Sequence, residues 1–428
     1  MMYPDFIYHK ISLENKVFMK SDIIVIGGGA SGMIAAICAA RQGASVIVLE
    51  RMAKVGKKLL ATGNGRCNYT NRKMNIDCFH SQELKIVNQI IKSFGNKDTE
   101  NFFMKLGILP KEKEGYVYPN SMQAASILDA LRFEMERLKV SVITDTHVTA
   151  ILPKGKGFQI QAKDKTFHCR RVILAAGGRA SEKLGSDGSG FKIVKELGYS
   201  LIPIVPALTG LKASEKVFKS LAGIRAEGRV TLFIDDRYVD VHEGEIQLAD
   251  YGISGIPVFQ LSSAAAYGLL NHKKVVCEMD FFPDMKEKDL AAYLIQRKNQ
   301  FGKASVETFE TGLLNRKLIH EIIKMAGKKD VQGYPDMKHL AHLIKHFPAT
   351  ITASRGYEFA QVCAGGISLK SIYAESMESK RHPGLYFVGE ILDVDGICGG
   401  YNLQWAWATG YLAGLHAGKE CHASHRTN

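Results

Sequence analysis

Residues 22–50 read Asp22-Ile-Ile-Val-Ile-Gly27-Gly-Gly29-Ala-Ser-Gly32-Met-Ile-Ala-Ala-Ile-Cys-Ala-Ala-Arg-Gln-Gly43-Ala-Ser-Val-Ile-Val-Leu-Glu50. This order predicts an apolar strand, a glycine turn, an alanine-rich helix and a second strand that ends in an acid. Gly27 permits a tight turn, Gly29 lets the backbone approach a pyrophosphate at the helix N-terminus, and Gly32 allows helix and strand to pack closely. Glu50 stands at the spacing where a carboxylate binds ribose hydroxyls. The stretch therefore predicts a dinucleotide-binding unit.

A membrane span is the alternative interpretation of this region, because residues 23–40 carry no charge. Three consecutive glycines favour a soluble protein instead, since Gly is a poor helix former and divides the apolar run. The N-terminus lacks a basic segment followed by an apolar core, so we expect a cytoplasmic protein that does not associate with membranes. Residues 1–19 read as an extension before the first strand, and translation from Met1 or from Met19 are both open.

The composition is that of a globular protein with an excess of positive charge. The chain has 428 residues, 46% hydrophobic and 23% charged, which suits about two or three domains. Its eight cysteines form no CxxC pair and no metal-binding spacing with histidine, so we expect no metal site. The formal net charge of +13 favours anionic partners without choosing among nucleotide, acidic substrate, RNA or membrane surface.

Basic residues follow Glu50 directly. From Arg51 to Lys73 the segment contains lysines and arginines but no acid, which suits contact with a phosphate. A solvated basic loop is the alternative for most of the individual lysines. Within the segment, Ala61-Thr-Gly-Asn-Gly-Arg-Cys-Asn68 is too rich in Gly and Asn for a helix or a regular strand, so we expect a specialised loop. Cys67 has no redox partner nearby and reads as a packing or cofactor-lining residue.

The rest of the pattern predicts an α/β fold with one domain built from both chain ends. Helical spacing marks residues 82–106 and 124–138, whereas 140–152, 158–162 and 171–178 are strand-like. Later segments alternate between strand-like and helical patterns. The predicted parts are a Rossmann-like domain from residues 20–200 and 356–428, a β-rich insert from 201–284 and 345–355, and a helical insert from 285–344.

Five motifs occur in order along the chain. They are residues 27–32, residues 61–68, residues 175–178 with 185–190, residues 251–255, and residues 389–396 with 399–402. Together they resemble the BaiN-like (YhiN-like) family of FAD-dependent oxidoreductases, part of a wider flavoprotein group that includes fumarate reductases. The resemblance covers about residues 20–415. One departure precedes Tyr251, where many relatives resemble Thr-His and this chain has Ala249-Asp250, so no histidine role is carried over.

The resemblance implies tightly bound FAD and, as a transient electron donor, NAD(P)H. A second helix N-terminus at Gly399 would stabilise reduced flavin, with a simple helix start as the alternative. Asp393 could equally cap a turn or bind the ribityl hydroxyls. The motifs and the resemblance together predict cofactor contacts from Gly27, Gly29, Ala30, Ser31, Gly32, Glu50, Arg51, Lys57, Asn64, Arg66, Cys67, Val148, Ala176, Gly177, Gly389, Glu390, Asp393, Gly400, Asn402 and Leu403.

For function, the resemblance implies reduction of C=C bonds conjugated to a ketone, as in 3-oxo-4-ene or 4,6-diene bile acids or their coenzyme A conjugates during 7-dehydroxylation. Arg66, Tyr118, Tyr251 and Tyr401 are candidate hydrogen-bond donors to the ketone oxygen, each equally readable as core or cofactor wall. We expect an anionic, apolar-bodied small molecule rather than nucleic acid. The alternatives are a fumarate-type or oxygen-using flavoenzyme, a tRNA-modifying flavoprotein, or a non-catalytic flavin-binding protein. The oligomeric state is open.

Overall fold

The structure is a computed structural model that describes residues 19–301, 305–327 and 333–426. The predicted N-terminal extension therefore lies outside the described residues, apart from Met19 in the first strand. The chain divides into two compact units. The first unit joins both chain ends, up to Ile204 and from Val362 onward, and the second unit is Val205–Gln361.

A mostly parallel sheet forms the centre of the first unit. Strand β1 (Met19–Ile26) lies between β2 (Val46–Leu49) and β10 (Lys165–Leu174), parallel to both. Its residues Ile23–Ile26 are buried, as expected for a strand covered on both faces. Strand β7 (Ser141–Ile143) pairs in parallel with β2, and β19 (Leu385–Phe387) pairs in parallel with β10. Strand β9 (Gly157–Ala162) pairs antiparallel with β10, and β8 (Val148–Lys154) pairs antiparallel with β9.

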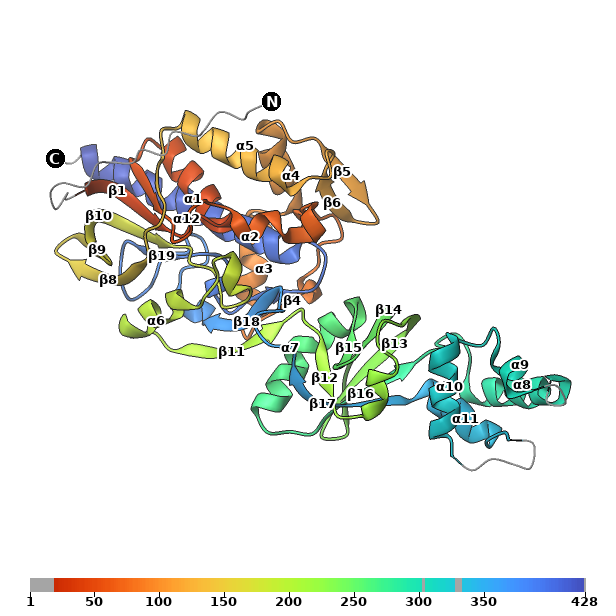
Figure 1. The fold of residues 1–428 in the computed structure, drawn as a ribbon. Coiled ribbons are helices and arrows are strands. Elements are labelled where there is room, and N and C mark those ends of the chain that lie inside the picture. The colour runs from red at the N-terminus through yellow and green to blue at the C-terminus, as the bar shows by residue number, and fades with distance from the viewer. Residues whose placement is uncertain (1–18, 302–304, 328–332, 427–428) are drawn as a thin grey trace. The chain divides into compact units, whose positions relative to one another are not determined.

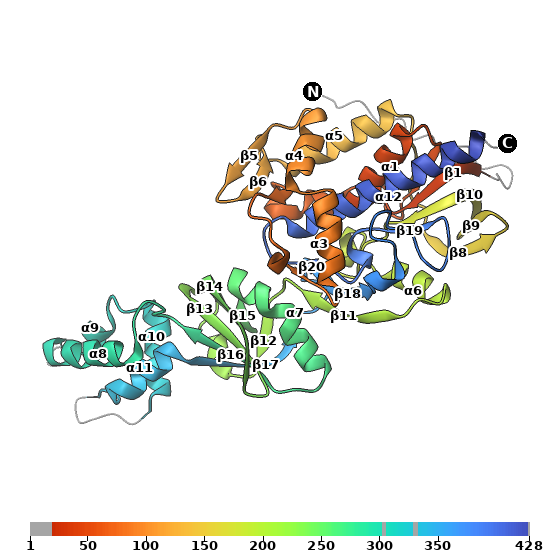
Figure 2. The same ribbon diagram turned by 180° about the vertical axis from the view of Figure 1, so that it is seen from behind.

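Helices α1 (Ala30–Arg41) and α12 (Tyr401–Arg426) pack along each other in this unit, as both views show (Figures 1 and 2). The contact is close because glycines of α12 face the α1 backbone. A Cβ atom at Gly410 would collide with the Ser31 carbonyl oxygen, and one at Gly414 would collide with the Ala35 carbonyl oxygen. Small residues therefore bring the N-terminal and C-terminal segments into backbone contact.

Shorter elements complete the first unit. They are helices α2 (Lys57–Leu60), α3 (Leu84–Ser93), α4 (Asn96–Lys105), α5 (Ala124–Arg137) and α6 (Ser189–Glu196), the strands β3 (Thr70–Asn71), β6 (Tyr116–Pro119) and β5 (Pro110–Lys113) of one small sheet, and the pair β4 (Phe79–His80) and β20 (Asp395–Gly396). The chain leaves this unit along β11 (Leu201–Ala207) and returns along β18 (Val362–Ile367), which pair with each other.

The second unit contains a closed antiparallel barrel. Its strands follow the order β12 (Leu211–Ala213), β15 (Gly252–Ser254), β14 (Arg237–Ala249), β13 (Arg225–Ile234), β16 (Val275–Asp280) and β17 (Phe347–Ser354), and β17 pairs back with β12. Helix α7 (Ile256–Leu270) packs against β13, β14 and β17. Closure removes the exposed strand edges that an open sheet would present.

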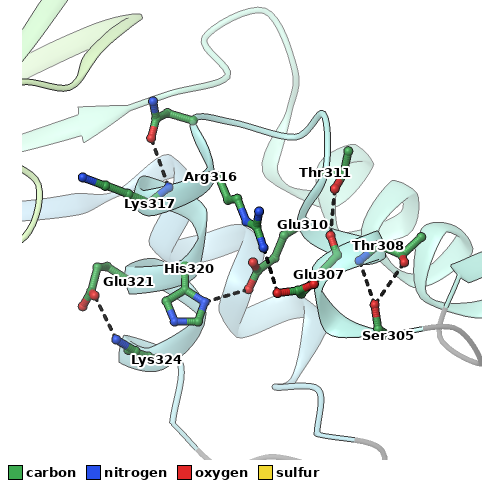
Figure 3. A network of polar contacts seen from close by, with 11 residues as sticks. Ser305, Glu307, Thr308, Glu310, Thr311, Arg316, Lys317, His320, Glu321 and Lys324 are labelled. Atoms are coloured by element: carbon green, nitrogen blue, oxygen red, sulfur yellow. Dashed lines mark hydrogen bonds and ion pairs between the residues drawn. The ribbon is translucent and has the colours of Figure 1, made fainter.

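Helices α8 (Glu287–Phe301), α9 (Val306–Glu310), α10 (Arg316–Met325) and α11 (Met337–Lys345) are inserted between β16 and β17. One hydrophobic cluster includes Leu232 and Phe347 of the barrel and Leu294 and Ile322 of these helices. Polar contacts join α9 to α10, as Figure 3 shows: the His320 ring lies 3.1 Å from the buried Glu310 carboxylate. Arg316 pairs with Glu307 at 2.7 Å.

These observations confirm the predicted α/β class, with a Rossmann-like domain from both chain ends and inserted strands and helices. The helical pattern predicted over residues 82–106 is confirmed, and the structure divides it into two helices, because α3 ends at Ser93 and α4 begins at Asn96. The break has a local cause: Gly95 caps α4, and its backbone N–H donates to the Asp98 carboxylate at 2.9 Å. The strand-like segment predicted over 140–152 likewise forms two strands, β7 and β8.

Replacing Gly414 with Ala should destabilise the protein. Alanine gains up to about 1 kcal/mol in helix propensity, but its Cβ would overlap the Ala35 backbone, and overpacking costs about 1–3 kcal/mol. We expect the free energy of unfolding in urea to fall by about 1–2 kcal/mol. Lys419→Ala, at an exposed position of the same helix, is the control and should change it by less than about 0.5 kcal/mol. A more stable Gly414→Ala protein would contradict the packing described here.

Candidate cofactor and active site

The glycine turn follows β1 at the edge where the parallel strands end. Gly27 has a φ of +104°, and a Cβ there would collide with the Ala175 carbonyl oxygen just after β10. Its backbone N–H donates to the Leu49 carbonyl at 2.8 Å. A residue with a side chain would be strained and would clash, so only glycine fits this turn.

Gly29 stands at the N-terminus of α1 and leaves space beside it. A Cβ added to Gly29 would meet no atom within 4 Å. No side chain caps this helix, and its first turn, Ala30 to Gly32, has no acidic residue. The first backbone N–H groups of a helix lack partners within it, and the helix dipole attracts an anion to them. The turn is therefore suited to a phosphate group, as predicted for Gly29, Ala30, Ser31 and Gly32.

Glu50, which directly follows β2, binds the backbone of the glycine turn. One carboxylate oxygen accepts a hydrogen bond from Gly28 N–H at 2.7 Å, and the other accepts one from Met52 N–H, also at 2.7 Å. The side chain is buried. Each carboxylate oxygen has a second lone pair, so ribose hydroxyls can still bind. Beyond the predicted ribose contact, Glu50 thus also positions the backbone of the glycine turn.

The basic residues after Glu50 have different environments. Arg51 pairs with Asp187 at 2.7 Å, while its buried Nε finds no hydrogen-bond partner among the described residues. Lys57 is exposed at the start of α2. Its neighbour Lys58, which sequence reasoning did not select, donates to Glu390 at 2.9 Å and to the Ala180 carbonyl at 3.2 Å. Which of the two lysines reaches Glu390 depends on the rotation of the short helix α2, and the amino-acid sequence does not reveal this rotation.

The Gly/Asn-rich segment forms a 3-10 turn, η1 (Thr62–Gly65), followed by a sharp bend. Asn64 is exposed with a φ of +55°, and Cys67 is buried with a φ of +57°. Burial raises the pKa of the Cys67 thiol to about 12. Asn68 is buried, and its Oδ1 atom has no partner among the described residues. Sequence reasoning did not select Asn68 as a cofactor contact, although Asn68 is the last residue of the Gly/Asn-rich motif 61–68.

The C-terminal segment 389–396 reaches the same site. A Cβ at Gly389 would lie 2.6 Å from Ser31 Oγ, so this loop contacts the first turn of α1. Glu390 accepts a hydrogen bond from Cys363 N–H at 2.9 Å in addition to its contact with Lys58. Asp393 is buried and accepts from Gln82 N–H at 3.2 Å; burial raises the pKa of its carboxyl group. Chain ends far apart in sequence therefore meet at the glycine turn.

The remaining predicted cofactor residues surround this region. Gly400 precedes α12, and a Cβ there would lie 2.9 Å from Asn68 Oδ1. Asn402 binds Gly396 through both polar atoms, at 2.8 Å to its N–H and 2.7 Å to its carbonyl. Leu403, in the first turn of α12, is partly exposed. Val148 begins β8, two residues after Thr146, whose N–H donates to the Glu50 carbonyl. Ala176 and Gly177 follow β10, next to Gly27.

The four candidate donors are not brought together equally. Arg66 is exposed, and its guanidinium lies 6.0 Å from the centre of the Tyr118 ring. Tyr401 is buried, and its hydroxyl donates to the Lys73 carbonyl at 2.9 Å. Tyr251 belongs to the second unit, where the Arg355 guanidinium lies 4.8 Å from its ring centre. Within the first unit, Arg66 and Tyr118 are thus the two candidates whose side chains lie together and are not buried.

A glycine turn at a helix N-terminus, at the carboxyl edge of a parallel sheet, defines a Rossmann-type dinucleotide-binding protein. The chain belongs to the HI0933-like protein family, whose Rossmann domain matches residues 21–416. The family resemblance predicted from the five motifs is thereby confirmed.

The chain matches two curated relatives over almost the entire length of each relative. The chain is 42% identical over 402 residues to 3-dehydro-bile acid delta(4,6)-reductase of Clostridium scindens, covering 92% of this chain and 98% of that protein. It is 28% identical over 414 residues to ribosomal RNA dihydrouridine synthase of Haemophilus influenzae, covering 94% and 99%. Among solved structures, 3-ketosteroid delta1-dehydrogenase from Sterolibacterium denitrificans shares the fold, with a TM-score of 0.50, 13% identity, and coverage of 94% and 100%.

FAD is the cofactor that this family and fold support, and the residues present fit it. The uncapped first turn of α1 and the open space at Gly29 suit a pyrophosphate. The buried, unpartnered atoms Arg51 Nε and Asn68 Oδ1 offer a hydrogen-bond donor and an acceptor.

No helix in the described part of the chain is long and apolar enough to cross a membrane. The expected cytoplasmic location stays a prediction.

Exchanging Gly29 for Ala should separate cofactor binding from folding. Its φ of −81° and ψ of −169° suit any residue, and the added Cβ meets no protein atom, so the melting temperature of the apoprotein should not change. The methyl group would occupy the space required by a phosphate. We expect the FAD dissociation constant, measured by titration of the apoprotein, to rise at least about tenfold, or about 1.4 kcal/mol. Unchanged FAD affinity would argue against a phosphate at this turn.

Gly27→Ala is the matched comparison, because its Cβ collides with the Ala175 backbone at a positive φ. This variant should lose stability before any cofactor is added, as measured by the melting temperature of the apoprotein. A stable Gly27→Ala apoprotein would contradict the turn geometry.

Cys67 should not react in the folded protein. Its thiol is buried and, with a pKa of about 12, almost entirely protonated at neutral pH, whereas alkylation requires the thiolate. After brief treatment with iodoacetamide, peptide mass spectrometry should find Cys67 unmodified and the partly exposed Cys78 modified. Both should react in denaturant. Rapid labelling of Cys67 in the native protein would show that the thiol is accessible and activated.

Proposed function

We propose that this protein is an FAD-dependent reductase of C=C bonds conjugated to a ketone, with 3-oxo-4-ene or 3-oxo-4,6-diene bile acids or their coenzyme A conjugates as substrates and NAD(P)H as electron donor. The observation that carries the proposal is the 42% identity to a 3-dehydro-bile acid delta(4,6)-reductase, which extends over 98% of that protein. The net charge of +13 supports an anionic substrate.

The chain's own residues have two tasks in such a reaction. Bound FAD supplies a ring system that takes up and releases a hydride equivalent. The residues of the glycine turn, together with Glu50 and the 389–396 loop, would hold that cofactor in place. Reduction of an enone builds negative charge on the ketone oxygen, which a positioned hydrogen-bond donor stabilises. We assign this donor role to Arg66 and Tyr118, because their side chains lie together and are not buried.

Tyr401 is a weaker candidate for the donor role, because its hydroxyl already donates to the Lys73 carbonyl. Its buried ring packs edge-on against Phe79, with 5.9 Å between the ring centres. These contacts favour a supporting role, in which Tyr401 fixes the backbone beside the start of α12.

Reduction of uracil in ribosomal RNA is a second candidate function. Two relatives, 28% and 27% identical, are ribosomal RNA dihydrouridine synthases, and a net charge of +13 suits a polyanion. The C5=C6 bond of uracil is also conjugated to a carbonyl group, so both reactions add hydride to an alkene and stabilise charge on an oxygen. The higher identity to the bile-acid enzyme favours the steroid substrate.

Anaerobic reoxidation of the reduced enzyme tests the proposal. The acceptors are 3-oxo-4-ene and 3-oxo-4,6-diene bile acids, fumarate, ribosomal RNA and oxygen, and the flavin absorbance is the readout. We expect rapid reoxidation by the steroid enones. Tyr118→Phe, which removes only a hydroxyl, should slow this step about 10²- to 10³-fold if it stabilises the oxygen, with unchanged FAD content.

Other outcomes would redirect the assignment. Rapid reoxidation by fumarate or oxygen with inert steroids would contradict the proposal. Turnover with ribosomal RNA alone, and its loss at high salt, would favour the second candidate. Parallel reduction of the oxidised enzyme with NADH and NADPH identifies the electron donor.

A further inference from the structure

Three potential metal ligands meet in the second unit, where α8 begins and α11 ends. Glu287 is the first residue of α8, His342 lies in the last turn of α11, and His346 is the residue that caps α11. One ligand atom from each of these side chains lies within 4.8 Å of the other two. The sequence predicted no metal site, and the tertiary fold alone brings Glu287 to the two histidines.

Each histidine nitrogen lies close to one of the two Glu287 carboxylate oxygens. His342 Nδ1 lies 3.4 Å from Glu287 Oε1, and His346 Nε2 lies 3.3 Å from Glu287 Oε2. Zinc binds imidazole nitrogen and carboxylate oxygen at about 2.0–2.1 Å in a tetrahedral arrangement, which separates the ligand atoms by about 3.3–3.4 Å. The two histidines are four residues apart, so they project from one face of the helix, and their rings stack at 4.7 Å.

A second carboxylate orients one of the histidines. Glu278, on β16, lies 3.0 Å from His346 Nδ1. If Nδ1 carries the proton and donates it to Glu278, the Nε2 lone pair faces the Glu287 side of the cluster. Histidines that bind metals commonly have such a carboxylate on the opposite ring nitrogen. The cluster therefore has the potential ligands and also a carboxylate that orients one of them.

The negative charges of the cluster are suited to a divalent cation. Glu278 and Glu287 together contribute two negative charges. Lys345, between the two histidines in sequence, does not neutralise them, because its ammonium group pairs with Asp280 at 2.6 Å and donates to the carbonyl oxygens of Phe282 and Met285. A dication would balance the two glutamates, whereas protonated histidine alone would make a half-exposed ion pair worth about 0–1 kcal/mol.

We propose that Glu287, His342 and His346 bind a divalent transition-metal ion, with Zn²⁺ as the best match to two imidazoles and one carboxylate. The side chains are about half exposed, at 44%, 54% and 41%, so water completes the coordination. The ion joins the start of α8 to the end of α11, and through Glu278 to the barrel strand β16. Its binding stabilises this helical insert by mass action, because the unfolded chain does not preform the site.

Calorimetric titration of the full chain with Zn²⁺ tests the site. The protein carries no histidine tag and is treated with a chelator that is then removed. We expect one high-affinity Zn²⁺ ion per chain and a higher melting temperature when it is bound. Co²⁺, used as a spectroscopic probe, should give the intense visible absorption of a four-coordinate ion. Absence of stoichiometric Zn²⁺ binding would overturn the proposal.

Variants assign the ligands. His342→Ala, His346→Ala and Glu287→Gln should each weaken Zn²⁺ binding at least about tenfold and abolish the Co²⁺ absorption, while Glu278→Gln should weaken binding about 10- to 100-fold as an orienting residue. His339→Ala is the matched control, because His339 is an exposed histidine of the same helix outside the cluster. Equal loss in His339→Ala, or unchanged binding in both His346→Ala and Glu287→Gln, would show adsorption to surface histidines and overturn the assignment.

Metal-free variants should keep the melting temperature of the metal-free parent, because the replaced side chains are half exposed. If one variant unfolds, the other two ligand variants still decide the assignment.

Discussion

The first unit depends on the backbone contact between α1 and α12. Gly410 and Gly414 leave no side chain between the helices, so α12 approaches the carbonyl groups of α1 directly. This contact holds the C-terminal segment against the glycine turn of the N-terminal segment. Gly389 then lies beside Ser31, and its N–H donates to Thr409 Oγ1 of α12 at 2.9 Å. The close packing of these two helices, together with the pairing of β19 with β10, brings residues from both chain ends to the site.

Two carboxylates organise the candidate site, and each accepts at least one hydrogen bond from a backbone N–H group. Glu50 holds Gly28 and Met52, and Glu390 holds Cys363 together with Lys58. Glu50 is buried, and a buried carboxylate without such partners would be costly, so its two backbone contacts account for its presence in the interior. The protein's own hydrogen bonds therefore connect the loops that form the cofactor region.

Sequence reasoning identified features whose signal is local, but it could not identify hydrogen-bond partners that lie far apart in the chain. The glycine turn, its flanking strands and the terminal Glu50 lie within residues 22–50, and the fold class followed from the repeated alternation of strands and helices. Tyr401 illustrates the limit: its hydroxyl was a candidate donor, yet it binds the carbonyl of Lys73 from the opposite end of the chain. The sequence likewise did not indicate that Lys58 reaches Glu390, because side-chain direction depends on local helix rotation.

The sequence by itself determined that this chain forms a Rossmann-type dinucleotide-binding domain from both ends, since periodicity and glycine placement are properties of neighbouring residues. It also carried enough separated motifs to indicate the family. Only the tertiary structure decided which polar groups meet: Lys58 with Glu390, and His346 with Glu278 and Glu287. The physical reason is that hydrogen bonds and ion pairs act over a few ångströms, and packing rather than sequence spacing brings distant residues within that range.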